Sequence, residues 1–135
     1  MTKDTSLIRK VDCIRVPVTD LDLGLKFYRD SLGHELIWRT STSIGLKIPE
    51  SEAELVIFTE PGEFEVDFKV NSVMTAAKFF KDSGGKIVSE PFDIPIGKCV
   101  IVKDPWDNKY ILLDSSKGTY KTDASGNVIG HNLAK

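Results

Sequence analysis

Apolar and polar residues alternate along residues 11–18, VDCIRVPV, and the segment is rich in β-branched side chains. This period of two predicts a β-strand whose successive side chains point to opposite faces. One face carries Asp12, Ile14, Val16 and Val18, and the other carries Val11, Cys13, Arg15 and Pro17. The second set is the more polar at its centre, so we expect the first set to pack against a helix.

The apolar spacing then changes to three and four residues, which predicts a helix over residues 21–32. Its buried stripe is expected at Leu21, Leu25, Tyr28 and Leu32, with Phe27 beside it. Thr19 and Asp20 supply an N-cap, and Gly33 supplies a left-handed C-terminal cap. Three further strands are predicted at residues 34–40, 43–48 and 54–59. Residues 8–60 therefore form one module of a strand, a helix and three strands.

Residues 62–114 repeat this order. A shift of 52 positions places residues 68–89 on residues 16–37 without a gap and matches six identical pairs, among them Lys26 with Lys78 and Gly33 with Gly85. The second module is predicted to contain a strand at 64–70, a helix capped by Asn71 or Ser72, and strands at 86–89, 98–103 and 109–114. The buried stripe of this helix is expected at Val73, Ala76 or Ala77, and Phe80.

A self-match at this period predicts two copies of one unit, a tandem βαβββ arrangement in the α+β class. Such paired units commonly share a cleft. Residues 1–116 are then a single domain, and residues 117–135 are a C-terminal hairpin or tail, with the hairpin built from residues 119–123 and 127–130.

Composition narrows the functional classes. A formal net charge of −2 argues against a nucleic-acid-binding protein, which would need clustered basic residues. No apolar run approaches the length of a membrane span, and the polar N-terminus lacks the apolar region of a signal peptide. Cys13 and Cys99 show no metal or redox spacing, so we interpret them as reduced thiols of a cytoplasmic protein.

Two segments carry a family resemblance: VTDLDLGLKFYRDSLGHELIWR and IPIGKCVIVKDPWDNKYILLD. Together with the paired modules, they resemble the vicinal oxygen chelate superfamily, which includes glyoxalase I, extradiol dioxygenases, and fosfomycin and bleomycin resistance proteins. The resemblance covers residues 8–114. It implies that each module curls its strands into half of a cup, that a small-molecule ligand sits inside the cup, and that the protein is a homodimer.

The superfamily contains both metal enzymes and metal-free binding proteins, so its ligand positions decide the chemistry. Metal-dependent members resemble one another in placing His or Gln early in the first strand of each module and Glu on the last strand. Here those positions hold Cys13, Glu65, Ile111, and Val56 or Ile57. A thiol, a carboxylate and two apolar residues do not make a catalytic metal site. His34 and His131 occupy no ligand position, so we predict neither a metal nor another cofactor.

If Cys13 and Glu65 face the cup, strand alternation places Arg15, Asp67 and Lys69 there too. These five residues and Trp106 are our candidate ligand-binding residues, and no residue is assigned a catalytic role. Arg15 suits a carboxylate or phosphate group. The alternative is that Arg15 and Asp67 neutralise each other. Cys13 is a nucleophile only if a neighbour lowers its pKa, and otherwise it is an inert thiol.

Two tryptophans could supply aromatic walls. Trp38 is expected in the core packing of its strand. Trp106 lies in the turn DPWDN, where it forms either the lip of a pocket or a dimer contact.

We therefore predict a metal-independent protein that binds a still unidentified small molecule and is not an enzyme. The alternative is a metal-dependent enzyme with a degenerate metal site at Glu65, acting as a lactoylglutathione lyase-like or dioxygenase-like protein. A role in protein interaction without any ligand is a third interpretation.

Overall fold

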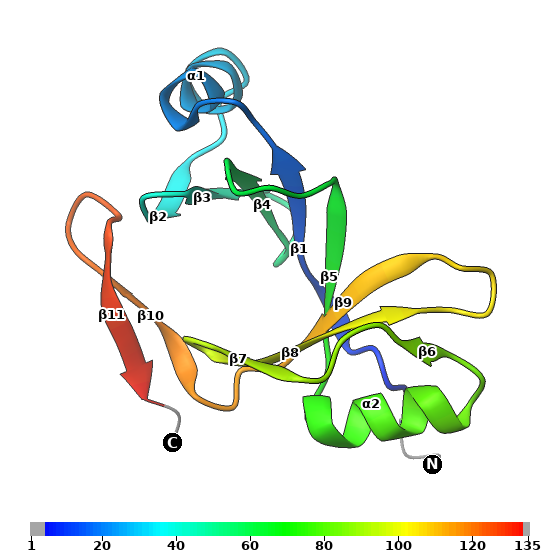
Figure 1. The fold of residues 1–135 in the computed structure, drawn as a ribbon. Helices are drawn as coiled ribbons and strands as arrows, with labels where there is room; N and C mark the ends of the chain where they lie inside the picture. The colour runs from blue at the N-terminus through cyan, green and yellow to red at the C-terminus, as the bar shows by residue number, and fades with distance from the viewer. Residues whose placement is uncertain (1–4, 134–135) are drawn as a thin grey trace.

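The computed structural model describes residues 5–133, in which the strands of both modules join one curved sheet (Figure 1). The first module contains β1 (Lys10–Pro17), α1 (Leu21–Leu25), the π-helical segment η1 (Lys26–Ser31), β2 (Leu36–Arg39), β3 (Ser43–Lys47) and β4 (Glu54–Phe58). The second contains β5 (Glu65–Lys69), α2 (Val73–Asp82), β6 (Lys86–Ile87), β7 (Phe92–Ile94), β8 (Gly97–Lys103) and β9 (Lys109–Leu113). Along the sheet the order is β2-β3-β4-β1-β5-β9-β8-β6, with β7 also paired to β8. The predicted α+β fold is confirmed.

The modules meet at β1 and β5, which pair in antiparallel fashion. Each of these strands pairs on its other side with the last long strand of its own module, β1 with β4 and β5 with β9, both in parallel. Ile14 lies opposite Val66, and these are equivalent positions in the repeat because they are 52 residues apart. The two modules are thus related by a pseudo-twofold axis through this pair.

The helices cover the outer side of the curve, one for each module, and each closes its own small core (Figure 1). Leu21 and Leu25 of the first helix pack with Ile44, Leu46 and Ile57. The second core joins residues of α2 with β8 and β9: Val70, Val73, Ala76, Ala77, Val100, Val102 and Leu112. Because apolar packing lies outside the curve, the inner face of the sheet is left to line the cup. Within residues 5–133 no helix is long and apolar enough to cross a membrane.

The predicted stripe of the first helix is wrong at Leu32, which is 52% exposed. The α-helix ends at Leu25, and in η1 the Leu32 amide donates to the Phe27 carbonyl five residues earlier. A π-helical turn contains more residues than an α-helical turn, so residues after it rotate off the expected face. Gly33 adopts the predicted left-handed conformation, with φ 85°.

The predicted strand at residues 86–89 is shorter than expected, and a second short strand follows it. β6 ends at Ile87, and β7 then pairs with the beginning of β8. Pro91 lies between them and has no amide hydrogen to donate to a ladder, which accounts for the interruption.

Residues 118–133 form the predicted C-terminal hairpin, from β10 (Gly118–Thr122) and β11 (Val128–Leu133). It is a separate two-stranded sheet and not an addition to the main one. Its turn is attached to the first module, where the Arg39 amide donates to the Gly126 carbonyl at 2.8 Å. Figure 1 shows the hairpin facing the concave side of the sheet.

Asp114 holds the junction between the second module and this hairpin. Its carboxylate is buried and accepts hydrogen bonds from the amides of Val73, Lys98 and Ser116 and from the Ser116 hydroxyl, at 2.8–3.2 Å. Burial raises the pKa of this carboxyl, but these four donors outweigh burial, and the pKa lies below its usual value.

We expect Asp114→Asn to lower the free energy of unfolding by about 1–3 kcal/mol at pH 7. The Asp114 carboxyl has a lower pKa in the folded state than in the unfolded chain, so its ionised form stabilises the folded protein at pH values above the unfolded-state pKa. This stabilisation is lost as the pH falls through the folded-state pKa. The difference between variant and wild type should therefore shrink in acid. Urea denaturation at pH 7 and below pH 4 measures this difference in the free energy of unfolding. Asp82→Asn, on the exposed face of α2, is the control. A constant difference at all pH values would contradict the assignment.

Candidate functional site

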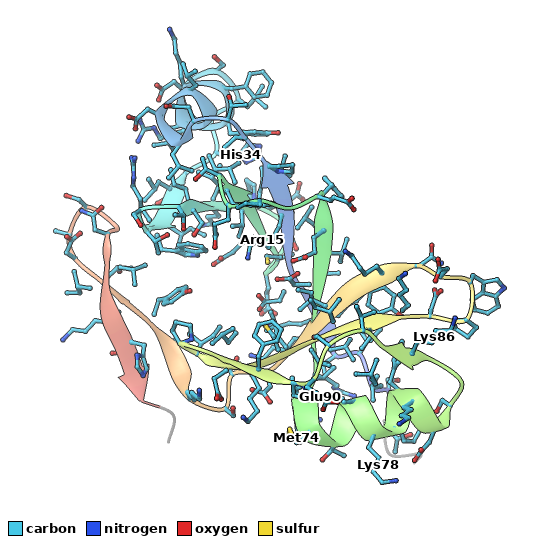
Figure 2. All side chains as sticks on the ribbon, in the orientation of Figure 1. Arg15, His34, Met74, Lys78, Lys86 and Glu90 are labelled. Atoms are coloured by element: carbon cyan, nitrogen blue, oxygen red, sulfur yellow. The ribbon has the colours of Figure 1, made fainter. Side chains whose placement is uncertain are left out.

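A cavity of about 500 Å³ lies on the concave side of the sheet, between the two modules and the C-terminal hairpin. β1, β2, β4, β5, β7, β8, β9 and β10 all contribute lining residues. Figure 2 shows side chains projecting from the concave face toward the hairpin, with Arg15 at the first module. The sequence-predicted residues Cys13, Arg15, Asp67 and Lys69 all line this cavity.

Cys13 and Asp67 form the floor. They are cross-strand partners on β1 and β5, each only 5% exposed, and the Cys13 thiol donates to Asp67 Oδ2 at 3.4 Å. Asp67 Oδ1 is buried and has no hydrogen-bond donor among the described residues. Glu65 lies two residues away on the same strand face. Two carboxylates interact favourably only when a proton or another cation lies between them.

The environment of Asp67 favours its neutral form. Burial is the main cause and the Glu65 carboxyl is the second, and together they raise the pKa of Asp67 to about 8. The Cys13 thiol and the Arg15 guanidinium oppose this shift without cancelling it. Asp67 is therefore a carboxylic acid that keeps its proton near neutral pH.

The two cysteines are not activated. Burial, and next the neighbouring Asp67 carboxyl group, raise the pKa of Cys13 well above its usual value. The same two causes raise the pKa of Cys99, which lines the cavity from β8, to about 12. Neither forms a disulfide. Since the thiolate is the nucleophile and the metal ligand, the environment of Cys13 favours the inert-thiol interpretation.

Arg15 is neutralised by a different carboxylate from the one the sequence suggested. Its Nη2 contacts Glu60 Oε1 at 3.4 Å, and its guanidinium lies 4.5 Å from the centre of the Phe58 ring. The expectation of an Arg15–Asp67 ion pair is wrong, because the antiparallel register puts Glu65 opposite Arg15 and Cys13 opposite Asp67.

One wall of the cavity is aromatic. Trp38 is 5.2 Å from Tyr120 of the hairpin, measured between ring centres, and its Nε1 donates to Glu54 Oε1 at 2.7 Å. Trp38 was expected in the core, but it lines the cavity because its ring lies over Gly45 of the neighbouring strand. A Cβ atom at Gly45 would lie only 2.1 Å from Trp38 Nε1. Tyr120 was missed in sequence because its segment lies outside the repeat.

Asp12 also lines the cavity, although simple alternation placed it on the opposite face from Cys13. The pairing of β1 with β5 shifts register between Val11 and Cys13. Such a bulge adds a residue to one strand and turns adjacent side chains toward the same side. Burial raises the pKa of Asp12, with Lys69 and Lys10 opposing the shift.

Two of the predicted residues do not line the cavity. Glu65 influences Asp67 from the same strand but is not itself a lining residue. Trp106 is 80% exposed in the turn between β8 and β9, which extends away from the hairpin in Figure 1. Its interpretation as the lip of the pocket is therefore wrong. His34 is half-buried, and its Nδ1 lies 3.0 Å from the Lys47 carbonyl oxygen.

The positions where metal-dependent relatives carry ligands do not fit a metal ion here. The Cys13 thiol is directed at Asp67, and Val56 and Ile111 have no donor atoms. Among residues 5–133 no group of three or more His, Cys, Asp or Glu side chains could hold a metal ion. The site is therefore built from a protonated acid, two thiols, an aromatic pair and scattered charges.

Residues 10–111 match the profile of the Glyoxalase/Bleomycin resistance protein/Dioxygenase superfamily. The chain belongs to this superfamily. Methylmalonyl-CoA epimerase from Mycobacterium tuberculosis has a similar fold, with a TM-score of 0.70 and 17% sequence identity. The similarity covers 84% of this chain and 92% of the epimerase chain. Methylmalonyl-CoA epimerase from Streptomyces coelicolor has a TM-score of 0.66 and 20% identity, covering 82% and 99% of the two chains.

Homoprotocatechuate 2,3-dioxygenase from Brevibacterium fuscum has a TM-score of 0.62 and 24% identity, covering 80% of this chain and 37% of that one. At these identities the likeness shows the superfamily fold alone. No curated protein matches the sequence. The match to the superfamily ends before β10, so Tyr120 and the hairpin lie outside it.

Gly45→Ala tests the position of Trp38. The new methyl group would collide with the indole ring and displace it from Glu54, and we expect a loss of about 1–3 kcal/mol in the free energy of unfolding. Tryptophan fluorescence should also change, because Trp38 leaves a half-buried site while Trp106 stays exposed. Trp106→Phe provides a background with Trp38 as the sole tryptophan. Unchanged emission and stability would contradict the placement of the ring.

Asp67→Asn tests the protonated floor. The folded state keeps this proton up to about pH 8, whereas the unfolded chain loses it near the ordinary value of 3.8. Folded protein then binds more protons between these values, so stability falls as pH rises through this range. The free energy of unfolding of the variant, relative to that of wild type, should therefore increase by on the order of a few kcal/mol between pH 5 and pH 8. Urea denaturation at several pH values measures this increase, with Asp30→Asn as the control. If the free energies of unfolding of Asp67→Asn and wild type change in parallel with pH, Asp67 is not protonated in the folded protein.

Proposed function

We propose that this protein binds a small organic molecule in the cup and does so without a metal ion. The observation that carries this proposal is the 500 Å³ cavity itself, which the two modules and the C-terminal hairpin enclose together. A cavity of this size is typical of small-molecule sites. Its lining combines apolar and aromatic residues with a similar share of charged and hydroxyl-bearing residues, which can orient a polar ligand.

The chemistry of the superfamily's metal positions supports metal independence. A metal site would need the Cys13 thiolate, but burial and Asp67 both favour its protonated form. The last-strand positions Val56 and Ile111 are apolar. Binding therefore relies on shape, hydrogen bonds and charge. As in the bleomycin-resistance type of protein that the sequence resembles, we propose sequestration in a cytoplasmic homodimer.

The test is native mass spectrometry of protein purified without chelators, together with elemental analysis. We expect an organic adduct and no stoichiometric divalent metal. Thr122→Trp, which places a large ring at the cavity lining, should abolish the adduct. Lys121→Trp on the adjacent residue, which does not line the cavity, is the matched control and should keep it. A stoichiometric metal that is lost in Glu65→Ala would contradict the proposal.

A further inference from the structure

The C-terminal hairpin lies across the cavity, with its base on the second module and its tip on the first (Figure 1). At the base, the Lys117 amide donates to the Ile96 carbonyl at 2.9 Å. At the tip, the Arg39 amide donates to the Gly126 carbonyl. Tyr120 lines the cavity between these two ends. The hairpin is therefore a wall of the cavity that bridges the two modules.

The floor beneath the hairpin is almost closed to solvent. Cys13, Cys99 and Leu113 line the cavity, yet they are only 5%, 6% and 4% exposed. A side chain that is covered to this extent reacts with a molecule from solvent only after a neighbouring segment moves. The segment of the wall that moves most easily therefore controls access to the floor.

The hairpin is the part of the wall with the least packing. Residues 119–132 are all exposed or half-buried, and none of them is buried. The hairpin forms a two-stranded sheet of its own, and its strand pairing with the main sheet is an isolated bridge between Arg39 and Asn127 rather than a ladder. Two-stranded hairpins are only marginally stable in water by themselves. Segments with few buried contacts open before the core does.

The base of the hairpin, by contrast, is firmly held. The Asp114 carboxylate accepts its four hydrogen bonds there, and Lys117 Nζ contacts Asp93 Oδ1 at 2.8 Å. Gly118 follows directly, with φ 125°, a conformation that residues with a side chain rarely adopt. Hinges are commonly formed by small residues at the end of an element, next to a fixed segment. These features place the pivot of the hairpin at Gly118.

The tip is the end that can be released. Besides the bond from Arg39 to Gly126, the Trp38 and Tyr120 rings lie 5.2 Å apart between centres. All four residues are half-buried, so water can replace the contacts that they lose. Release of the tip breaks no ladder of the main sheet. The hairpin can therefore open without unfolding of either module.

We propose that residues 118–133 act as a gate over the cup, which swings about Gly118, releases its tip from β2 and opens the floor to solvent. In the closed state, the contact of Tyr120 with Trp38 completes the aromatic wall. This inference goes beyond the proposed function, because it assigns the route into the cup whichever molecule binds there. It involves no covalent step, and its test needs no ligand.

A reversible lock tests the gate. Arg39→Cys combined with Asn127→Cys places two thiols at the bridge partners, whose backbones lie roughly 5 Å apart, within the span of a disulfide. Oxidation fixes the tip, and reduction frees it. We expect N-ethylmaleimide to modify Cys99 at least about tenfold faster in the reduced form than in the oxidised form. Equal rates in the two forms would overturn the gate.

Peptide mapping by mass spectrometry follows Cys99 separately from the two introduced thiols, and Cys13 provides a second buried reporter of the same cavity. The wild-type protein, treated with the same oxidant and reductant, is the control. Its Cys99 should be modified at one rate after both treatments. A wild-type difference as large as that of the double variant would show that the lock is not the cause and would overturn the assignment.

Gly126→Ala loosens the tip without a lock. Gly126 has φ 86°, and a Cβ atom there would lie only 2.5 Å from Leu36 Cδ2. Gly33→Ala is the matched control, because Gly33 has φ 85° but its Cβ atom would meet nothing within 4 Å. We expect Gly126→Ala to raise the rate of Cys99 modification at least about threefold over Gly33→Ala. The same rate in both variants would contradict the gate.

Hydrogen exchange of the full chain shows whether the opening is local. Amides of residues 118–133 should exchange as one group, faster than those of β1 and β5 and with little dependence on added urea. If the hairpin exchanges as slowly as β1 and β5, it opens only when the whole protein unfolds, and the gate is wrong.

The gate and the proposed function fail separately. If the lock slows modification of Cys99 but native mass spectrometry finds no organic adduct, the gate stands and the proposed function falls. If the adduct is present and the lock has no effect on Cys99, binding in the cup stands and the gate falls.

Discussion

Ile14 of β1 lies opposite Val66 of β5, and the placement of the other groups in the cup follows from that antiparallel pair. Because the pair is symmetric in the repeat, Cys13 must face Asp67 and Arg15 must face Glu65. The parallel pairing of each strand with β4 or β9 then extends the sheet in both directions. Side chains on one face meet the helices and form two cores, and those on the other face are left to line a cavity.

That geometry explains why an acid is buried without a counter-charge. Repeat symmetry brings two carboxyl-bearing residues, Glu65 and Asp67, onto the central strand of the second module, whereas the equivalent residues of the first are Cys13 and Arg15. Arg15 lies close enough to lower the pKa of Asp67, but it is bonded to Glu60 and does not neutralise it. The protein therefore tolerates a neutral carboxyl group in its floor.

Much of this fold could be predicted from sequence because its signals are local and repeated. Alternation in the first strand of each module placed five residues in the cup, and all of them except Glu65 line the cavity: Cys13, Arg15, Glu65, Asp67 and Lys69. What failed depended on geometry that periodicity does not encode. A bulge brought Asp12 to the cavity, a π-turn exposed Leu32, and Pro91 divided a strand.

Trp38 is the most instructive case. A large apolar ring in a strand indicates core packing, and only its cross-strand neighbour shows otherwise, because Gly45 leaves the space that the indole ring occupies. Sequence alone does not reveal which residues of two strands are paired until the register is known. For the same reason the pairing of Arg15 with Glu60 could not be anticipated: the two residues come from separate strand ends brought together by the parallel β1–β4 contact.

The hairpin lies beyond the residues that match the superfamily. The superfamily match ends at residue 111, but Tyr120 and its neighbours complete the wall opposite the sheet. Asp114 fixes the point where the chain leaves β9, and Gly126 anchors the far end against Arg39. The cavity is thus closed on one side by a segment that lies beyond the residues matching the superfamily. In this protein the central strands provide the polar floor of the cavity, and the appended hairpin provides half of its aromatic wall.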